Sequence, residues 1–123
     1  MRSLPIGLGV ILSVLLVSEA WAKRTSPKPV TPVIQNGVKY VAPNLSGRQG
    51  VVEARDEKTD KKLWDVVVYS VRLDRNLEED VQWVFVTRLA VHDNNLVVTN
   101  EKNESFAVDL RTKKVQKLKD EKK

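Results

Sequence analysis

The stretch ARDEKTDKKLW, residues 54–64, decides the fold class of this chain. It ends one extended segment, forms a charged turn and begins a second extended segment. The stretch AVDLRTKK, residues 107–114, aligns with its first eight residues without a gap and repeats the Ala, Asp, Thr and Lys in register. In each copy we expect the Asp to accept hydrogen bonds from the amides of the turn and the Thr hydroxyl to close it. The residues given this structural role are Asp56, Thr59, Asp109 and Thr112.

Apolar residues alternate with a period of two on both sides of these turns, which is typical of strands. Residues 66–73 (VVVYSVRL) are rich in β-branched and aromatic side chains, and Asn36-Gly37 between apolar residues indicates a tight hairpin. Residues 74–80 (DRNLEED) interrupt the pattern and suit a single helical turn. The sequence therefore predicts an all-β fold, a single small antiparallel sheet or sandwich of six to seven short strands with at most one helical turn.

The longest predicted strand, residues 81–91, places apolar side chains at alternate positions on one face. We expect this face to form the floor of a single hydrophobic core. The aromatic residues Trp83, Phe85 and Phe106 are predicted to be buried, because they stand at period-two strand positions. The full set on this face is Val81, Trp83, Phe85, Leu89 and Val91.

The first 22 residues have the organisation of a cleaved secretory signal peptide. Arg2 supplies a positive start, residues 4–17 are apolar, and Ala20-Trp21-Ala22 places small residues where a signal peptidase cuts. As a helix the apolar run would span about 21 Å, short of the roughly 30 Å of a bilayer core. We therefore predict cleavage before Lys23, export to the periplasm or the cell exterior, and no transmembrane segment after cleavage.

The mature chain, residues 23–123, suits one domain. Residues 23–32 hold three prolines and no hydrophobic period, which predicts an extended tether rich in Pro and Lys. We expect a single β domain over residues 33–118 and a basic tail at 119–123. The whole chain has a net charge of +5 and no cysteine, so disulfides are excluded. The basic excess gathers at the two ends of the mature chain, where solvated tails are the favoured interpretation.

The repeated stretch resembles a hairpin of a known family. The pattern A-x-D-x-x-T-G-K-x-x-W is the outer hairpin in blades of quinoprotein-like (PQQ-repeat) β-propellers, and Asp60 stands where that pattern has its glycine. FAVDLRTKKV, residues 106–115, is similar to the same hairpin without the Trp. A propeller needs at least four blades and this chain has material for two, so the resemblance implies blade-shaped hairpins without a central quinone pocket. The matching residues are Ala54, Asp56, Thr59, Lys61, Leu63 and Trp64.

The wider pattern, from GVVEARDEKTDKKLWDVVVY to LVVTNEKNESFAVDLRTKKV, also resembles small exported bacterial proteins of unknown function that carry this hairpin. The resemblance to these proteins implies no activity.

Residue content excludes several chemistries. Without cysteine there is no thiol nucleophile, and His92, the one histidine, ends a strand beside an Asp-Asn-Asn turn. No G-x-S-x-G elbow accompanies any serine, and a zinc site cannot be built from one His and no Cys in the usual ligand sets. The glycines form no phosphate-binding loop. We therefore expect no catalytic residue outside the carboxylates considered next, no metal site and no cofactor.

Four residues remain as candidates for binding. The consecutive carboxylates Glu78, Glu79 and Asp80 suit a solvated turn, and the alternative is general acid–base chemistry. Trp64 is surrounded by charged neighbours, so it is either a core residue or an exposed stacking surface.

We predict a small exported β domain that serves as a non-catalytic binding or structural accessory in the cell envelope. The alternative is a small hydrolase or carbohydrate-active enzyme that uses the Glu78, Glu79 and Asp80 carboxylates. An enzyme requires carboxylates that converge in a concave site, whereas a binding module does not. The expected partner is another envelope protein or an anionic polymer, with no nucleic acid, and open edge strands offer a route to homo-oligomers.

Overall fold

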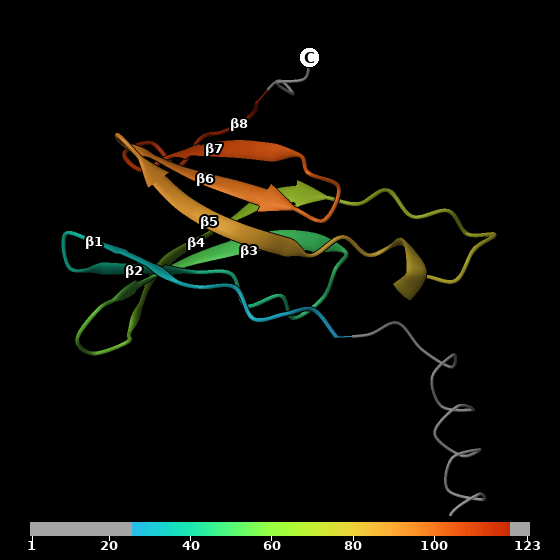
Figure 1. Cartoon of the computed structure of the whole chain (residues 1–123), viewed down its shortest axis with the longest axis horizontal. Helices are drawn as coiled ribbons and strands as arrows, with labels where there is room; N and C mark the ends of the chain where they lie inside the picture. Colours follow the sequence, from blue (N-terminus) through green and yellow to red (C-terminus); the bar gives the residue numbers. More distant parts are fainter. Residues whose placement is uncertain (1–25, 119–123) are drawn as a thin grey trace, which may run out of the picture.

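The computed structural model describes residues 26–118 as two four-stranded antiparallel sheets that pack face to face (Figure 1). Sheet A has the strand order β1-β2-β3-β4 and sheet B the order β5-β6-β7-β8, so each is an up-and-down meander. The 3-10 turn η1, Asp80–Gln82, is the one helical element in residues 26–118. The strands are β1 Val33–Gln35, β2 Val38–Val41, β3 Gln49–Asp56, β4 Lys62–Ser70, β5 Val86–His92, β6 Asn95–Asn100, β7 Ser105–Asp109 and β8 Val115–Lys117.

The predicted all-β antiparallel fold with at most one helical turn is confirmed, but the number of strands is eight rather than six to seven, and the helical turn lies at Asp80–Gln82 rather than over residues 74–80. Both three-residue strands, β1 and β8, pair in register with their neighbours and complete the two sheets. Residues 26–32 have no regular secondary structure, yet Val30 packs against the core, so this part of the predicted tether is joined to the domain. The predicted signal peptide and basic tail lie outside the described residues.

The prediction of one strand over residues 81–91 is wrong in its first half. Val81 belongs to η1 and is 61% exposed, Trp83 is half-buried outside the core cluster, and β5 begins only at Val86. A register irregularity between Val86 and Arg88 then shifts the alternation. As a result Val86 and Leu89, three residues apart, both reach the core. The predicted burial of Phe85 and Phe106 is confirmed.

The core lies between the two sheets and is built from both. Val52 and Ala54 of β3 are fully buried, as are Leu96 and Val98 of β6. Tyr69 of β4 stacks on Phe106 of β7, with ring centroids 5.3 Å apart. The buried residues of this cluster are Tyr40, Val52, Ala54, Val68, Val86, Leu89, Leu96, Val98, Phe106 and Val108.

The two repeated turns have the same hydrogen bonds. Asp56 Oδ1 accepts from the amides of Lys58 and Thr59 at 2.9 and 3.0 Å. Asp109 Oδ1 accepts from Arg111 and Thr112 at 2.8 and 3.1 Å. In both turns the Thr hydroxyl accepts from the amide two residues later, at 3.3 Å. These bonds are those that the sequence pattern predicts.

The hydrogen bonds from the turn amides also act on the carboxylates. The amides of Thr59 and then Lys58 lower the pKa of Asp56, and those of Thr112 and then Arg111 lower the pKa of Asp109. The residues after the two Asp, Glu57 and Leu110, each donate an amide hydrogen bond of 2.9 Å to the neighbouring hairpin turn of their own sheet. Each repeated turn therefore ties two hairpins together.

The two sheets do not bury equivalent faces of the repeated unit: the face that sheet A turns to the core corresponds to the outer face of sheet B. Ala54 in β3 is fully buried against sheet B, whereas Ala107, its counterpart in the repeat, is only half-buried. The next pair is reversed, because Val108 is fully buried and Arg55 is in an ion pair with Glu53 on the outer face. Opposite faces of the same four-stranded unit thus meet in the core, and the outer faces of the two sheets differ in composition.

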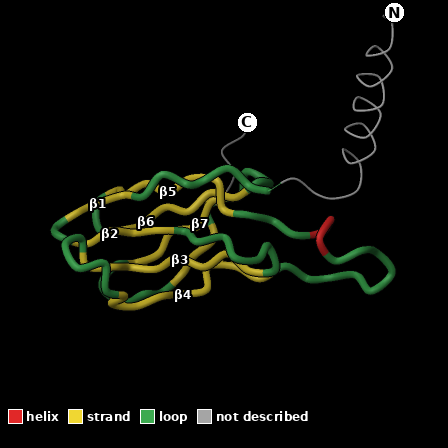
Figure 2. The backbone as a smooth tube through the Cα atoms, turned by 90° about the horizontal axis from the view of Figure 1, so that it is seen from below, coloured by secondary structure: helices red, strands yellow, loops and turns green. Residues whose placement is uncertain are grey.

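Alternate connections lie at opposite ends of the sandwich (Figure 1). At one end, which we call the hairpin end, are the four tight turns that join β1 to β2, β3 to β4, β5 to β6 and β7 to β8. At the other, the connection end, are the segments between the remaining strands, residues 42–48, 71–85 and 101–104. The longest of these, 71–85, links the two sheets and projects beyond the sandwich (Figure 2).

Candidate functional site

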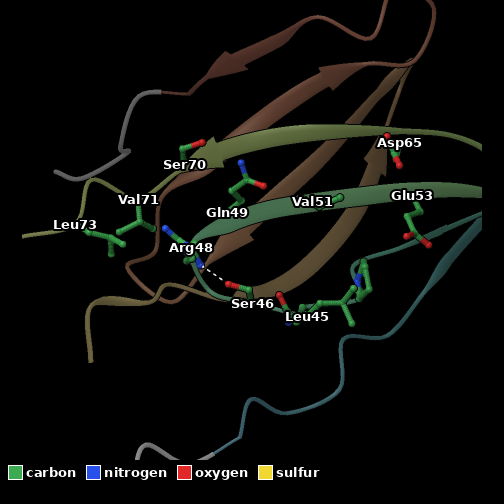
Figure 3. Close-up of a pocket in the computed structure, with 12 residues that line it drawn as sticks. Leu45, Ser46, Arg48, Gln49, Val51, Glu53, Asp65, Ser70, Val71 and Leu73 are labelled. Carbon is green, nitrogen blue, oxygen red and sulfur yellow. Dashed lines mark hydrogen bonds between the residues drawn. The ribbon is translucent and has the colours of Figure 1, made fainter. Parts of the chain in front are cut away.

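An open groove of about 700 Å³ lies on the outer face of sheet A, toward the connection end (Figure 3). Its floor is formed by Gln49, Val51 and Glu53 of β3 with Asp65 and Ser70 of β4. One wall is the segment 43–48 and the other begins at Val71 and Leu73, just after β4. We call this cavity the sheet A groove.

Aliphatic side chains stand in both walls of the sheet A groove, beside the polar residues Asn44, Ser46 and Arg48. Leu45 on the 43–48 wall is 88% exposed, the highest exposure among the exposed large hydrophobic side chains of residues 26–118. Val71 and Leu73 stand at one end of the groove and Val51 lies in its floor (Figure 3). A ligand that covers Leu45 would therefore remove apolar surface from water on both partners.

Two carboxylates mark the far end of the groove. Glu53 and Asp65 are register partners on β3 and β4. Glu53 pairs with Arg55 at 2.8 Å, and Asp65 pairs with Lys62 at 2.8 Å. The hydrogen bond that Lys62 donates to Asp65 raises the pKa of Lys62. Each carboxylate is thus neutralised by a basic residue of its own strand, which suits a binding surface better than a reacting pair.

The wall that carries Leu45 is held by long-range contacts. The side-chain amide of Asn44 donates to the backbone carbonyl of Val86 at 2.9 Å, and its oxygen accepts from the backbone amide of Val86 at 3.0 Å. Asn44 thus pairs with the first residue of β5 in the way that a neighbouring strand would. Asn44 adopts φ of +50°, which asparagine tolerates better than most residues. Gly47 lies against the backbone and side chain of Trp83, where no Cβ fits.

Glu79 ties the projecting segment to the groove wall. Its carboxylate pairs with Arg48 at 3.1 Å and accepts from the indole nitrogen of Trp83 at 3.2 Å. Gln82 organises the same segment from within, because its amide bonds to the backbone of Asp74, Leu77 and Glu78. Glu79 therefore positions the wall of the groove, and it is the one member of the predicted carboxylate cluster with this role.

The other predicted binding residues do not join the groove. Neither Glu78 nor Asp80 lines it, and no side-chain contact brings the three carboxylates together within residues 26–118. Trp64 is half-buried at the edge of the core, with its ring 6.1 Å from that of Tyr40. Lys113 of the second repeated turn places its ammonium 4.8 Å from the centre of the Trp64 ring. Trp64 thus links the two sheets through a cation–π contact.

Groups of three or more His, Asp or Glu side chains arranged to hold a metal ion are absent from the described part of the chain. No helix among residues 26–118 is long and apolar enough to cross a membrane. Comparison with protein-family models and with curated proteins finds no match to this chain. The arguments about function therefore rest on the groove, its walls and their charges.

Sequence reasoning did not single out Asn44, Leu45, Arg48 or Leu73 as site residues. The signal for Leu45 was present, since a leucine within the loop PNLSGRQG at residues 43–50 is out of place unless something covers it. No local pattern marks Asn44, because its partner Val86 is 42 residues away.

Proposed function

We propose that this chain is an exported, non-catalytic binding module and that its ligand occupies the sheet A groove. The observation that carries the proposal is a preformed groove with aliphatic side chains in both walls and an 88% exposed Leu45 at its rim. Concave, largely apolar cavities with a few polar groups are the usual form of ligand sites. The signal-peptide pattern of residues 1–22 supports export to the envelope.

The shape of the groove favours an extended peptide segment of another envelope protein. From Glu53 to Gln49 the floor follows one strand, which at about 3.3 Å per residue spans roughly 13 Å, enough for about four extended residues. Aliphatic side chains of such a segment would contact Leu45, Val71 and Leu73. Its charged or polar positions would lie over Glu53 and Asp65, where paired charges already line the surface.

The resemblance to propeller blades supports a scaffold role for the rest of the molecule. Each sheet is a four-stranded meander that closes on the same Asp-Thr turn, and the two sheets stack back to front, as successive blades do. No observation favours the alternative of a hydrolase, because Glu79 is engaged by Arg48 and neither Glu78 nor Asp80 lines the groove.

The test is selection of eight-residue peptides from a random library displayed on phage, with the mature chain as target. We expect the selected peptides to contain alternating aliphatic residues. Leu45→Asp should weaken their binding at least about tenfold, since burial of one leucine contributes roughly 1.5–3 kcal/mol. Ile34→Asp is the matched control, because Ile34 is also exposed on sheet A but lies outside the groove.

Selection of no peptide above background would contradict the proposal. Equal weakening by Leu45→Asp and Ile34→Asp would also contradict it, since binding would then depend on general exposure of apolar surface. The thermal midpoints of both variants should match that of the wild type, because both side chains are more than half exposed.

A further inference from the structure

A second recess lies at the connection end, between the ends of the two sheets. It consists of two neighbouring cavities of about 360 and 320 Å³ that share Val71, Arg72, Val84 and Lys102 as lining residues. Arg72 follows β4 of sheet A, and Lys102 is in the turn between β6 and β7 of sheet B. We call these joined cavities the intersheet trough.

Arg72 and Lys102 bring two positive charges from different elements to the intersheet trough. Both are exposed, and neither side chain makes a hydrogen bond or ion pair with another residue of the range 26–118. Other cations of residues 26–118 are paired with a carboxylate, as Arg48 is with Glu79. Two free cations from different sheets that line the same two cavities are therefore a distinct feature.

The carboxylates that line the trough are already engaged. Glu104 accepts from the amide of Asn100 at 3.0 Å and pairs with Lys117 at 3.2 Å. These partners, Asn100 first, lower the pKa of Glu104, and the charge of Lys102 adds a smaller effect. Glu101 accepts a hydrogen bond from the backbone amide of Phe85 at 3.2 Å. The lining of the two cavities thus holds three cations, Arg72, Lys102 and Lys117, against the two carboxylates, which leaves an excess of positive charge for whatever enters the trough.

We propose that the intersheet trough binds an oxyanion with at least two negative charges, either a phosphate group or a polycarboxylate. The guanidinium of Arg72 offers paired donors that match two oxygens, and the ammonium of Lys102 supplies a second point of charge. Val71, Val84 and Trp83 form the apolar part of the lining, which limits the water that would screen these contacts. This site adjoins the sheet A groove, with which it shares Val71, but its charged residues Arg72 and Lys102 lie outside the groove. The proposal does not depend on the function proposed for the groove.

The test is titration of the mature chain with inorganic pyrophosphate and, separately, with citrate, followed by backbone amide NMR shifts at low ionic strength. We expect saturable shifts around residues 71–73 and 101–104. Arg72→Gln and Lys102→Gln should each weaken binding about three- to fivefold, the range of one exposed ion pair. Salt at about 150 mM should weaken binding in the wild type.

Arg88→Gln is the matched control, because it removes the same charge from an exposed position on β5 outside the trough. It should weaken binding by less than about 1.5-fold, as a change in net charge alone does at this distance. Saturation by pyrophosphate alone assigns a phosphate ligand, and saturation by citrate alone assigns a carboxylate. Equal weakening by all three variants, or no saturation below about 10 mM of either probe, overturns the proposal.

The groove variant Leu45→Asp separates the two sites. It should leave pyrophosphate or citrate binding within about 1.5-fold of the wild type, whereas Arg72→Gln should leave peptide binding unchanged. Loss of both activities in either variant would mean that the trough is not an independent site.

Discussion

The hairpin end and the connection end of this sandwich are built in different ways. At the hairpin end, two turns 53 residues apart have the same set of hydrogen bonds, and each turn is closed by residues within five positions of its Asp. At the connection end, Asn44 bonds to Val86, Tyr69 donates to the carbonyl of Val84 at 2.6 Å, and Arg48 pairs with Glu79. Local bonds hold one end and long-range bonds hold the other.

The candidate sites follow this division. The sheet A groove and the intersheet trough both lie toward the connection end, where the segments differ in length and composition. The repeated turns at the hairpin end contribute no lining residue to either. The comparison teaches that the repeated hairpins supply the shape of each sheet, whereas the unrepeated connections supply the surfaces that can bind.

The same substitution at each end should separate them most clearly. Gly47→Asn at the connection end should destabilise the protein by about 1–3 kcal/mol or more, because a Cβ there meets the side chain of Trp83 and lies 3.0 Å from its Cα. Gly37→Asn at the hairpin end should destabilise the protein less, by about 1 kcal/mol, since nothing lies within 4 Å and the strain at its φ of +79° is smaller for asparagine than for most residues. Urea unfolding measures both, and equal midpoints would remove the distinction between the ends.

The equivalence of the two turns predicts equal effects of Asp56→Ala and Asp109→Ala. Each removes two side-chain bonds to turn amides. By analogy with the loss of a helix cap, each should lower Tm on the order of 5 °C. The two shifts should add in the double variant, because the turns share no hydrogen bond. If thermal unfolding showed a lower Tm in only one of the two variants, the two turns would be alike in sequence but would contribute unequally to stability.

The smallest expected effect is on the loss of thermal stability at acidic pH. The folded-state pKa of Asp56 and Asp109 is lowered by the turn amides, so the unfolded chain binds protons more readily as pH falls. Their contribution is fully present above a pH of about 4 and is lost as pH falls through the folded-state pKa values. The double variant Asp56→Asn, Asp109→Asn should therefore lose less Tm between pH 5 and pH 2 than the wild type. If Tm fell equally with pH in the wild type and the double variant, Asp56 and Asp109 would not contribute to the loss of stability in acid.

Sequence patterns predicted the all-β fold and the turns because those features depend on neighbours along the chain. Asp56 and Asp109 find their donors two and three residues away, and Asn36-Gly37 needs only positive φ at both residues, which are +54° and +79° here. The alternation rule failed where the chain departed from a regular strand. The turn η1 left Val81 in solvent, and the irregularity between Val86 and Arg88 brought Val86 and Leu89 to the core, two changes that no local pattern announces.

The candidate site was predicted only in part. Glu79 was named for its charge, but its partner Arg48 stands 31 positions earlier, and its role as an anchor depends on how segment 71–85 folds back on the 43–48 wall. The sequence did not distinguish a buried Trp64 from an exposed one. In the structure Trp64 is half-buried, and Lys113 from the other sheet lies over its ring. Predictions of this kind fail because the partner is chosen by the packing of two sheets and not by spacing along the chain.

By itself, the sequence determined that this chain forms antiparallel strands joined by Asp-Thr and Asn-Gly turns, since hydrogen bonds over two to five residues are specified by residue type. Only the tertiary structure decided that opposite faces of the repeated unit meet, burying Ala54 in sheet A but Val108 in sheet B. The same structure decided that Leu45 remains exposed beside a groove and that Arg72 and Lys102 line one trough. Those outcomes depend on which of two faces of each sheet releases more apolar surface from water when the sheets pack, a property of the whole assembly of strands.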